Sequence, residues 1–265
     1  MDMETRNGIK DYAGTARKIG QEKIIRTLTW VYRWGWSSRE IIARVAGDEL
    51  RYAARLVKKG LLRKVNHPTS RMLPSAYVLT DAGLMVAIDN MAGLLESHNL
   101  QIDYPWVANR SRLAWTYFEH GLAVQKAMIS LGCHSDTAGH WWAPEREMRG
   151  ANHRGALPDG MVMTARADDN QITWIEIERS FKNEEQRALQ LWDRLQALKA
   201  GRFHKIRWVC ATNGLALALE RALGKPFIPK TWRDELSRIW REPSLGKALE
   251  PLRRASSISL LGEME

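Results

Sequence analysis

Apolar residues in the first third of the chain recur at the three- and four-residue spacing of amphipathic helices. The pattern predicts a helix over residues 22–34, and Gly35 ends it. Ser37 and Ser38 precede the next apolar stretch, and a hydroxyl in that position caps a helix, so a second helix is predicted over residues 39–45. Gly47 and Gly60 bracket a third predicted helix, residues 49–59.

Two β-prone stretches follow these helices. They cover residues 61–65 and 76–80, and a polar loop separates them. Asp81 then opens another predicted helix. Three helices followed by a two-stranded hairpin is the plan of a helix-turn-helix domain with a wing. The first part of the chain, residues 1–104, is therefore interpreted as a winged-helix DNA-binding domain with a linker.

The third predicted helix is the element that would read DNA. Its inward face is predicted from its apolar positions, which are Leu50, Ala53, Ala54 and Val57. The helix and the hairpin that follows it carry a run of cations, which are Arg51, Arg55, Lys58, Lys59, Arg63 and Lys64. A basic recognition helix beside a basic wing reaches the major groove and the adjacent phosphates. The alternative interpretation is a winged helix that contacts protein, with its charges merely solvated.

The pattern changes after a connector over residues 96–112, in which Pro105 breaks any long helix. A second domain, residues 105–265, is predicted. Its order is α-β-β-β-α-β with a final helix, and the predicted elements are residues 113–131, 140–148, 161–164, 171–179, 183–199, 205–211 and 215–223. The fold class predicted for the whole chain is mixed α/β (α+β). The tail after Pro243 is either partly disordered or docks on another surface through Ile258, Leu260 and Leu261.

Charge strengthens the DNA interpretation. The chain has a net charge of +10 at pH 7, and a basic surface attracts polyanions, above all nucleic acids. Residues 1–100 carry 16 Lys and Arg against 10 Asp and Glu, which contributes +6 of that charge. The surplus of positive charge therefore falls where the predicted DNA-reading helix lies.

Other classes of protein receive no support from the sequence. No apolar run reaches the roughly 18 residues that a membrane-spanning helix needs, so no membrane insertion is expected. The first ten residues lack the apolar core of a secretory signal, so a bacterial cytoplasmic location is expected. Two cysteines, Cys133 and Cys210, do not make a disulfide framework or a four-ligand zinc site and are expected to be buried thiols.

The predicted strand over residues 171–179 carries two carboxylates in an apolar setting. Side chains alternate along a strand, so Trp174, Glu176 and Glu178 share one face. Two unpaired carboxylates are expensive to bury, and something must compensate them. A divalent cation, Mg²⁺ or Mn²⁺, is one solution, because these metals prefer oxygen ligands. Arg and Lys side chains from a neighbouring helix are the other.

A third carboxylate lies near these two in the predicted topology. Asp159 stands at the mouth of the hairpin whose second strand holds Glu176, and adjacent antiparallel strands can bring the two together.

Arg149 and Arg154, in a basic turn before Asp159, are candidates to hold the DNA backbone, with a solvated loop as the alternative. His120, on the first helix of this domain, either lines the site or is a structural residue.

These residues resemble a known nuclease pattern. Pro158-Asp159 followed by Glu176-Ile177-Glu178, on the order α-β-β-β-α-β, is similar to the PD-(D/E)xK superfamily with its restriction-endonuclease-like core, over residues 111–223. The resemblance implies that Asp159, Glu176 and Glu178 hold the metal and take part in catalysis. Glu178 stands where the pattern has lysine, and Lys182 is the candidate to replace that lysine. Glu145, on the preceding predicted strand, is the preferred source of another metal ligand, ahead of Glu147.

The whole chain resembles the replication-relaxation family, which includes MobC-type plasmid relaxases. A predicted wing stands in front of Trp142-x-x-Glu145, Pro158-Asp159-Gly160 and Trp174-Ile-Glu-Ile-Glu-Arg179. The resemblance implies a metal-dependent endonuclease that nicks DNA at a plasmid origin of transfer. It implies DNA as the partner, with other mobilisation or coupling proteins and a second copy of the chain as further candidates. Metal-dependent chemistry is favoured over a tyrosine nucleophile, because no His-rich cluster accompanies the six tyrosines. The alternative is a non-catalytic DNA-binding regulator of replication or transcription with a degenerate nuclease core.

Overall fold

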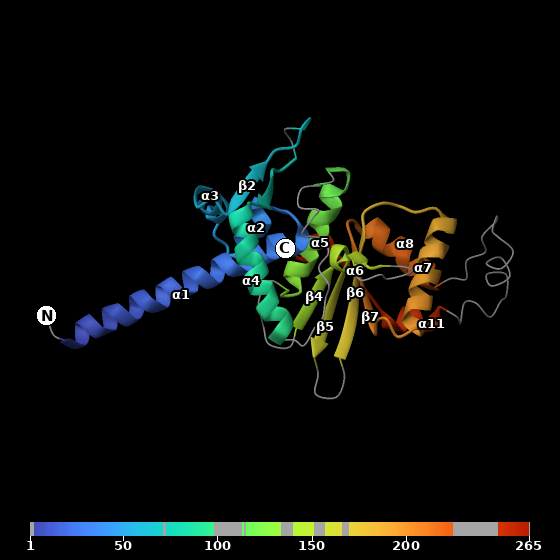
Figure 1. Ribbon diagram of the computed structural model, residues 1–265. Helices are drawn as coiled ribbons and strands as arrows, with labels where there is room; N and C mark the ends of the chain where they lie inside the picture. Colours follow the sequence, from blue (N-terminus) through green and yellow to red (C-terminus); the bar gives the residue numbers. More distant parts are fainter. Residues whose placement is uncertain are drawn as a thin grey trace. The chain divides into compact units, whose positions relative to one another are not determined.

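The structure is a computed structural model that describes residues 3–70, 73–97, 113, 115–133, 140–150, 157–165, 170–224 and 249–264. The chain divides into two compact units, Met1–Thr116 and Tyr117–Glu265, each of which has its own sheet. The predicted mixture of helices and strands is confirmed (Figure 1).

The first unit consists of four helices and a small antiparallel sheet. In chain order the elements are α1 (Met3–Trp34), β1 (Ser37–Ser38), α2 (Arg39–Val45), α3 (Tyr52–Lys58), β2 (Leu62–Val65), β3 (Ala76–Leu79) and α4 (Asp81–Ser97). The sheet has the order β1-β3-β2, and β2 pairs antiparallel with β3 (Figure 1). Three helices followed by a hairpin is the order that the sequence predicts.

Local sequence signals account for most of these boundaries. Ser38 caps α2 as predicted, because its hydroxyl accepts a hydrogen bond from the backbone N–H of Ile41 at 3.3 Å. Gly35 and Gly60 adopt positive φ angles of 81° and 71° where helices end. Two features differ from the prediction: α1 begins at Met3, well before residue 22, and Ser37 and Ser38 also pair with β3.

The predicted inward face of the third helix is confirmed at Ala53 and wrong at Leu50, Ala54 and Val57. The buried side chains of α3 are Tyr52, Ala53 and Leu56. Leu50 is 62% exposed, Val57 is 37% exposed, and Ala54 is also exposed. Tyr52 and Leu56 lie one turn apart on one face, and burying these two large side chains removes more apolar area from water than burying two alanines. The helix is therefore rotated relative to the prediction.

The second unit is built on a five-stranded mixed sheet of order β4-β5-β6-β7-β8. Its first strands, β4 (His140–Pro144), β5 (Gly160–Ala165) and β6 (Asn170–Glu178), are antiparallel neighbours. The remaining strands, β7 (Lys205–Cys210) and β8 (Ser256–Leu260), run parallel to β6. The helices are α5 (Phe118–Ser130), α6 (Glu145–Gly150), α7 (Glu184–Lys199), α8 (Asn213–Gly224) and α11 (Glu250–Ala255), and short 3₁₀ turns cover Trp115–Tyr117 and Leu261–Met264.

The predicted order of the second unit is present, with one correction. The strand predicted over residues 140–148 ends at Pro144, and Glu145 begins α6. Pro144 is paired with the first residue of β5, so the ladder has no further partner there. Glu145 and Glu147 then fall in the first turn of a helix, where carboxylates are favoured by the helix dipole. They therefore do not line a strand face as predicted.

The C-terminal residues dock on the sheet. Strand β8 adds a parallel edge strand to β7, and Leu249 and Leu252 are almost completely buried against the helical layer. The docking alternative is therefore confirmed for residues 249–264. Residues 225–248, which include Pro243, lie outside the described residues.

Helices lie on both faces of this sheet. The main core joins one face of β6 and β7 to α7, α8 and α11, and its large members include Trp174, Trp208, Leu191 and Leu219 (Figure 1). The other face packs against α5. Gly160 of β5 lies so close to Met128 of α5 that a Cβ added to this glycine would be 3.0 Å from the methionine sulfur. The carboxylates of β6 share the face of Trp174, so the fold directs them toward α7.

Candidate functional site

Two buried carboxylates lie side by side on the α7 face of β6. Glu176 is 4% exposed and Glu178 is 1% exposed. Their sequence neighbours Ile175 and Ile177 lie on the opposite face of the strand. An ionised carboxylate in such a position is strongly unfavourable unless it is paired and hydrogen-bonded. The residues that compensate these two charges therefore define the chemistry of the site.

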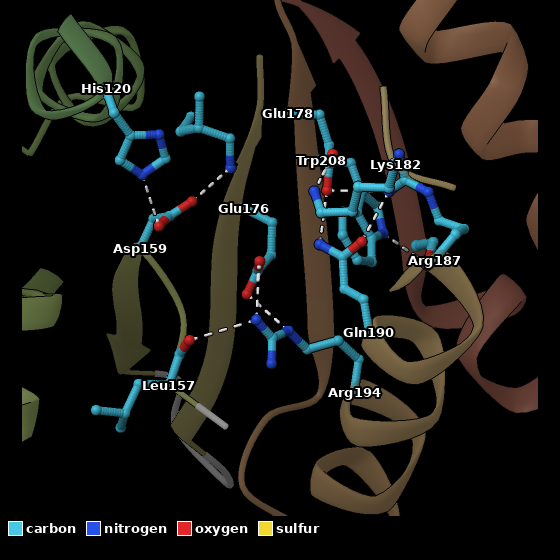
Figure 2. A network of polar contacts seen from close by, with 12 residues as sticks. His120, Leu157, Asp159, Glu176, Glu178, Lys182, Arg187, Gln190, Arg194 and Trp208 are labelled. Carbon is cyan, nitrogen blue, oxygen red and sulfur yellow. Dashed lines mark hydrogen bonds and ion pairs between the residues drawn. The ribbon is translucent and has the colours of Figure 1, made fainter. Parts of the chain in front are cut away.

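Glu178 is fully engaged by cations and an amide (Figure 2). Lys182 Nζ lies 2.6 Å from one oxygen of Glu178, and the amide of Gln190 donates to the other at 2.6 Å. Arg187, itself buried, lies 3.0 Å from the same carboxylate. Lys182 precedes α7, and Asn183 fixes the start of that helix through a capping box with Gln186. The first turns of α7 thus hold Glu178 in place.

Glu176 is paired with one arginine of α7. Arg194 donates from its terminal nitrogen to Oε2 of Glu176 at 3.0 Å, and its Nε lies 2.8 Å from Oε1. The second contact is an ion pair without hydrogen-bond geometry, so Nε and Oε1 are both buried without a hydrogen bond. The guanidinium also contacts the carbonyl of Leu157 at 3.4 Å (Figure 2). It lies 5.7 Å from the ring centroid of Trp174.

Burial dominates the electrostatics of Glu176. Its removal from water raises the pKa of this carboxyl to about 8, because the charged form loses its hydration. Arg194 acts in the opposite direction, and the nearby charges of Asp159 and Glu178 add to the increase in pKa. Glu176 therefore changes its protonation well above the pH range of an ordinary carboxyl group.

Asp159 lies just before β5, directly opposite Glu176. The β5–β6 ladder pairs Gly160 with Ile175, so one further step of the same register brings Asp159 beside Glu176. The carboxylate of Asp159 accepts a hydrogen bond from the backbone N–H of Ile177 at 2.7 Å through Oδ2. Its Oδ1 lies 2.9 Å from Nε2 of His120 (Figure 2). Asp159 thus joins the start of β5 to β6 and to α5.

His120 is tied to this cluster by the same contact. The hydrogen bond that His120 makes to the carboxylate of Asp159 raises the pKa of the imidazole, although burial acts against that increase. Beside it, Glu119 and Arg179 form an ion pair at 2.5 Å that connects the start of α5 to the end of β6. The sequence left a structural role open for His120, and its contact with Asp159 places it among the candidate site residues.

The structure brings several predicted site residues together and leaves others apart. Asp159 lies at the start of β5, Glu176 and Glu178 lie on β6, and Lys182 lies just before α7. Asp159 has different partners from the two glutamates. Glu145 is on α6, and Arg149 is in the same helix, although its side chain lies outside the described residues. Arg154 lies outside the described residues altogether.

The carboxylates as arranged here do not fit a Mg²⁺ or Mn²⁺ ion. Among the described residues, no group of three or more His, Cys, Asp and Glu side chains is placed to hold a metal. Glu176 and Glu178 face the cations of α7, whereas both oxygens of Asp159 contact His120 and the backbone of β6. The alternative compensation that the sequence left open, cations on a neighbouring helix, is therefore the arrangement found.

Sequence reasoning missed the three polar residues of α7 that contact these carboxylates. Arg187, Gln190 and Arg194 follow the three- and four-residue spacing of one helix face, next to the apolar stripe that packs on the sheet. A helix that follows a strand with two carboxylates, and that carries cations at this spacing, is a detectable signal. The sequence indicated Arg and Lys of a neighbouring helix as possible partners, but these three residues were not among the candidates.

The predicted DNA-contacting cations of the first unit are all exposed. They are Arg51, Arg55, Lys58, Lys59, Arg63 and Lys64. They come from α3, the residues next to it and β2. Arg55 forms an ion pair with Glu49, which leaves the positive charge of this surface in excess.

The described helices include none that is both long enough and apolar enough to cross a membrane.

The raised pKa of Glu176 predicts how stability depends on pH. Between about pH 4.5 and about pH 8 the folded protein keeps a proton that the unfolded chain has lost, so the free energy of unfolding falls as pH rises through this window. The contribution is at most about 1.4 kcal/mol per pH unit.

Wild type and Glu176→Gln are compared by urea denaturation across this range with EDTA present, and the stability of wild type relative to the variant should fall with pH. The exposed-residue control Glu185→Gln should follow wild type, and parallel profiles for wild type and Glu176→Gln would contradict the prediction.

Comparison with known proteins identifies the family. The family described as replication-relaxation matches residues 28–205, which includes α2, α3, the β2–β3 hairpin and the strands that carry Asp159, Glu176 and Glu178. No curated protein and no solved structure matches the chain. The matched region covers more than half of the sequence, and we conclude that this chain belongs to the replication-relaxation family.

Proposed function

We propose that this protein binds duplex DNA through α3 and the β2–β3 hairpin and acts in plasmid replication or mobilisation, at an origin of transfer. Membership of the replication-relaxation family points to a role in plasmid replication or mobilisation. The observation that carries the DNA-binding proposal is the set of exposed cations on α3, beside it and on β2. In this interpretation the first unit is a winged helix and α3 is its recognition helix.

The packing of α3 supports this interpretation. The helix is anchored by Tyr52, Ala53 and Leu56, so its opposite side is presented to solvent. Arg51 and Lys58 lie on that exposed side, and Arg63 and Lys64 continue the positive surface into β2. Cations at the N-terminal side of a recognition helix contact base edges and phosphates, and those of a wing contact the adjacent backbone.

The double variant Arg51→Ala/Lys58→Ala should bind duplex DNA more weakly than wild type. When a phosphate contact is lost, fewer counterions are released on binding. The slope of log affinity against log salt should therefore shrink by about 0.9 per contact. Fluorescence anisotropy with a labelled linear duplex at several salt concentrations measures both quantities.

The matched control for this prediction is Lys199→Ala/Arg221→Ala. It removes the same charge from exposed positions on α7 and α8 of the second unit. The control should retain both the affinity and the salt slope of wild type. If the two double variants weaken binding equally, the net charge of the chain rather than the surface of α3 is responsible, and the proposed interface is wrong.

A second candidate function is the cleavage of one DNA strand by a metal-dependent relaxase activity. The specific observation in its favour is the position of Asp159 directly opposite Glu176, with Oε1 of Glu176 lacking a hydrogen bond. The cation pairing of Glu176 and Glu178 argues against it and favours a DNA-binding regulator with a degenerate nuclease core. DNA binding by α3 is common to both candidates, so cleavage needs its own test.

The test is conversion of supercoiled plasmid to open circles by the full chain, in Mg²⁺, in Mn²⁺ and with EDTA. The plasmid carries the DNA that flanks the coding region. If the second candidate holds, wild type nicks only with metal, and Asp159→Ala and Glu176→Ala each remove the activity. A wild-type protein that binds the plasmid and leaves it supercoiled in both metals contradicts cleavage and supports the regulator.

A further inference from the structure

The exposed side of α3 carries an apolar stripe as well as a basic one. Leu50 is 62% exposed and Val57 is 37% exposed, and Ala54 lies between them. Ala54 and Val57 follow helical spacing on α3, and Leu50 is exposed in the turn that leads into this helix, so together the three make one apolar line. Arg51, Arg55 and Lys58 repeat the same spacing one residue later and form a parallel line. The outer face of α3 is therefore half apolar and half basic.

One exposed apolar side chain is ordinary on a protein surface, but an apolar line beside a row of cations is a surface whose burial on binding a suitable partner would be favourable. The neighbouring charges identify the class of partner. The apolar line lies directly beside three exposed cations of the same helix, and two further cations, Arg63 and Lys64, continue into β2. This mixture complements a polyanion that also offers apolar groups, which describes the major groove of DNA.

Thymine is the base that supplies the apolar group. In the major groove it presents the O4 acceptor and a 5-methyl group, whereas cytosine presents a donor and no methyl group. We propose that Leu50, Ala54 and Val57 read thymine methyl groups, so that α3 selects duplexes through their 5-methyl groups. Leu50 precedes the first turn of α3, and the N-terminal residues of a recognition helix are those that contact base edges. This inference rests on the proposed DNA binding and adds its specificity.

In this proposal the two lines of side chains on α3 contribute differently to DNA binding. The cations supply affinity that is independent of sequence, since phosphates are the same at every base pair. The apolar line supplies discrimination, because burying one methyl group contributes about 0.8 kcal/mol, which corresponds to about a fourfold change in affinity. Removing the methyl groups from DNA should therefore lower affinity while the salt dependence remains.

The experiment compares two synthetic duplexes that differ only in the 5-methyl group, alternating poly(dA-dT) and alternating poly(dA-dU). The full chain should bind the thymine duplex at least about fourfold more tightly, the factor expected for one methyl contact. Leu50→Ala and Val57→Ala should bring this ratio toward one by weakening binding to the thymine duplex alone. The matched control Met85→Ala, which truncates a 58% exposed apolar side chain on α4, should keep the wild-type ratio.

Three other outcomes would contradict the inference, and each one has a different meaning. Equal affinity of wild type for the two duplexes removes methyl recognition and leaves the proposed DNA binding intact. Failure to bind either duplex contradicts both proposals. A change in sedimentation mass caused by Leu50→Ala, with the thymine preference kept, assigns the apolar line to contact between copies of the chain.

Discussion

The second unit depends on the neutralisation of two carboxylates that its central strand buries. Glu176 and Glu178 project from β6 into the layer formed by α7, where little solvent reaches them. Their burial would oppose folding if Arg194, Arg187 and Lys182 did not face them. The ion pairs and the apolar core around Trp174 and Leu191 both require that α7 presents this side to β6.

The same interaction separates two interpretations of the site. A strand that carries Glu-x-Glu opposite an aspartate resembles a metal-binding nuclease motif, and the ladder does bring Asp159 opposite Glu176. The cations of α7 supply the compensation that a metal would otherwise supply, and Asp159 contacts His120 and the backbone of β6. The geometry therefore favours a structural polar network beside an acid–imidazole pair. DNA recognition by the first unit is consistent with either interpretation.

Periodicity and caps predicted much of the fold. Helix α2 begins after its serine cap, and β5, β6, α7 and β7 lie within one or two residues of their predicted bounds, because each has a strong local pattern. The errors came from tertiary packing. The rotation of α3 was decided by burial of Tyr52 and Leu56 against the rest of the unit, and the strand that ends at Pro144 lost its ladder partner. The partners of Glu176 lie on a helix that follows it in the sequence, and no short motif joins the two.

Above about pH 8, where Glu176 is ionised, Arg194 should hold its charge inside the protein. A double-mutant cycle with Glu176→Ala, Arg194→Ala and the double variant tests it, by urea denaturation at about pH 9, where Glu176 is ionised. Each single truncation should lower the free energy of unfolding by about 3–5 kcal/mol, because it leaves one buried charge unpaired. The double variant should lose clearly less than the sum of the two. Losses that simply add would show that the two side chains are not coupled and would contradict the account.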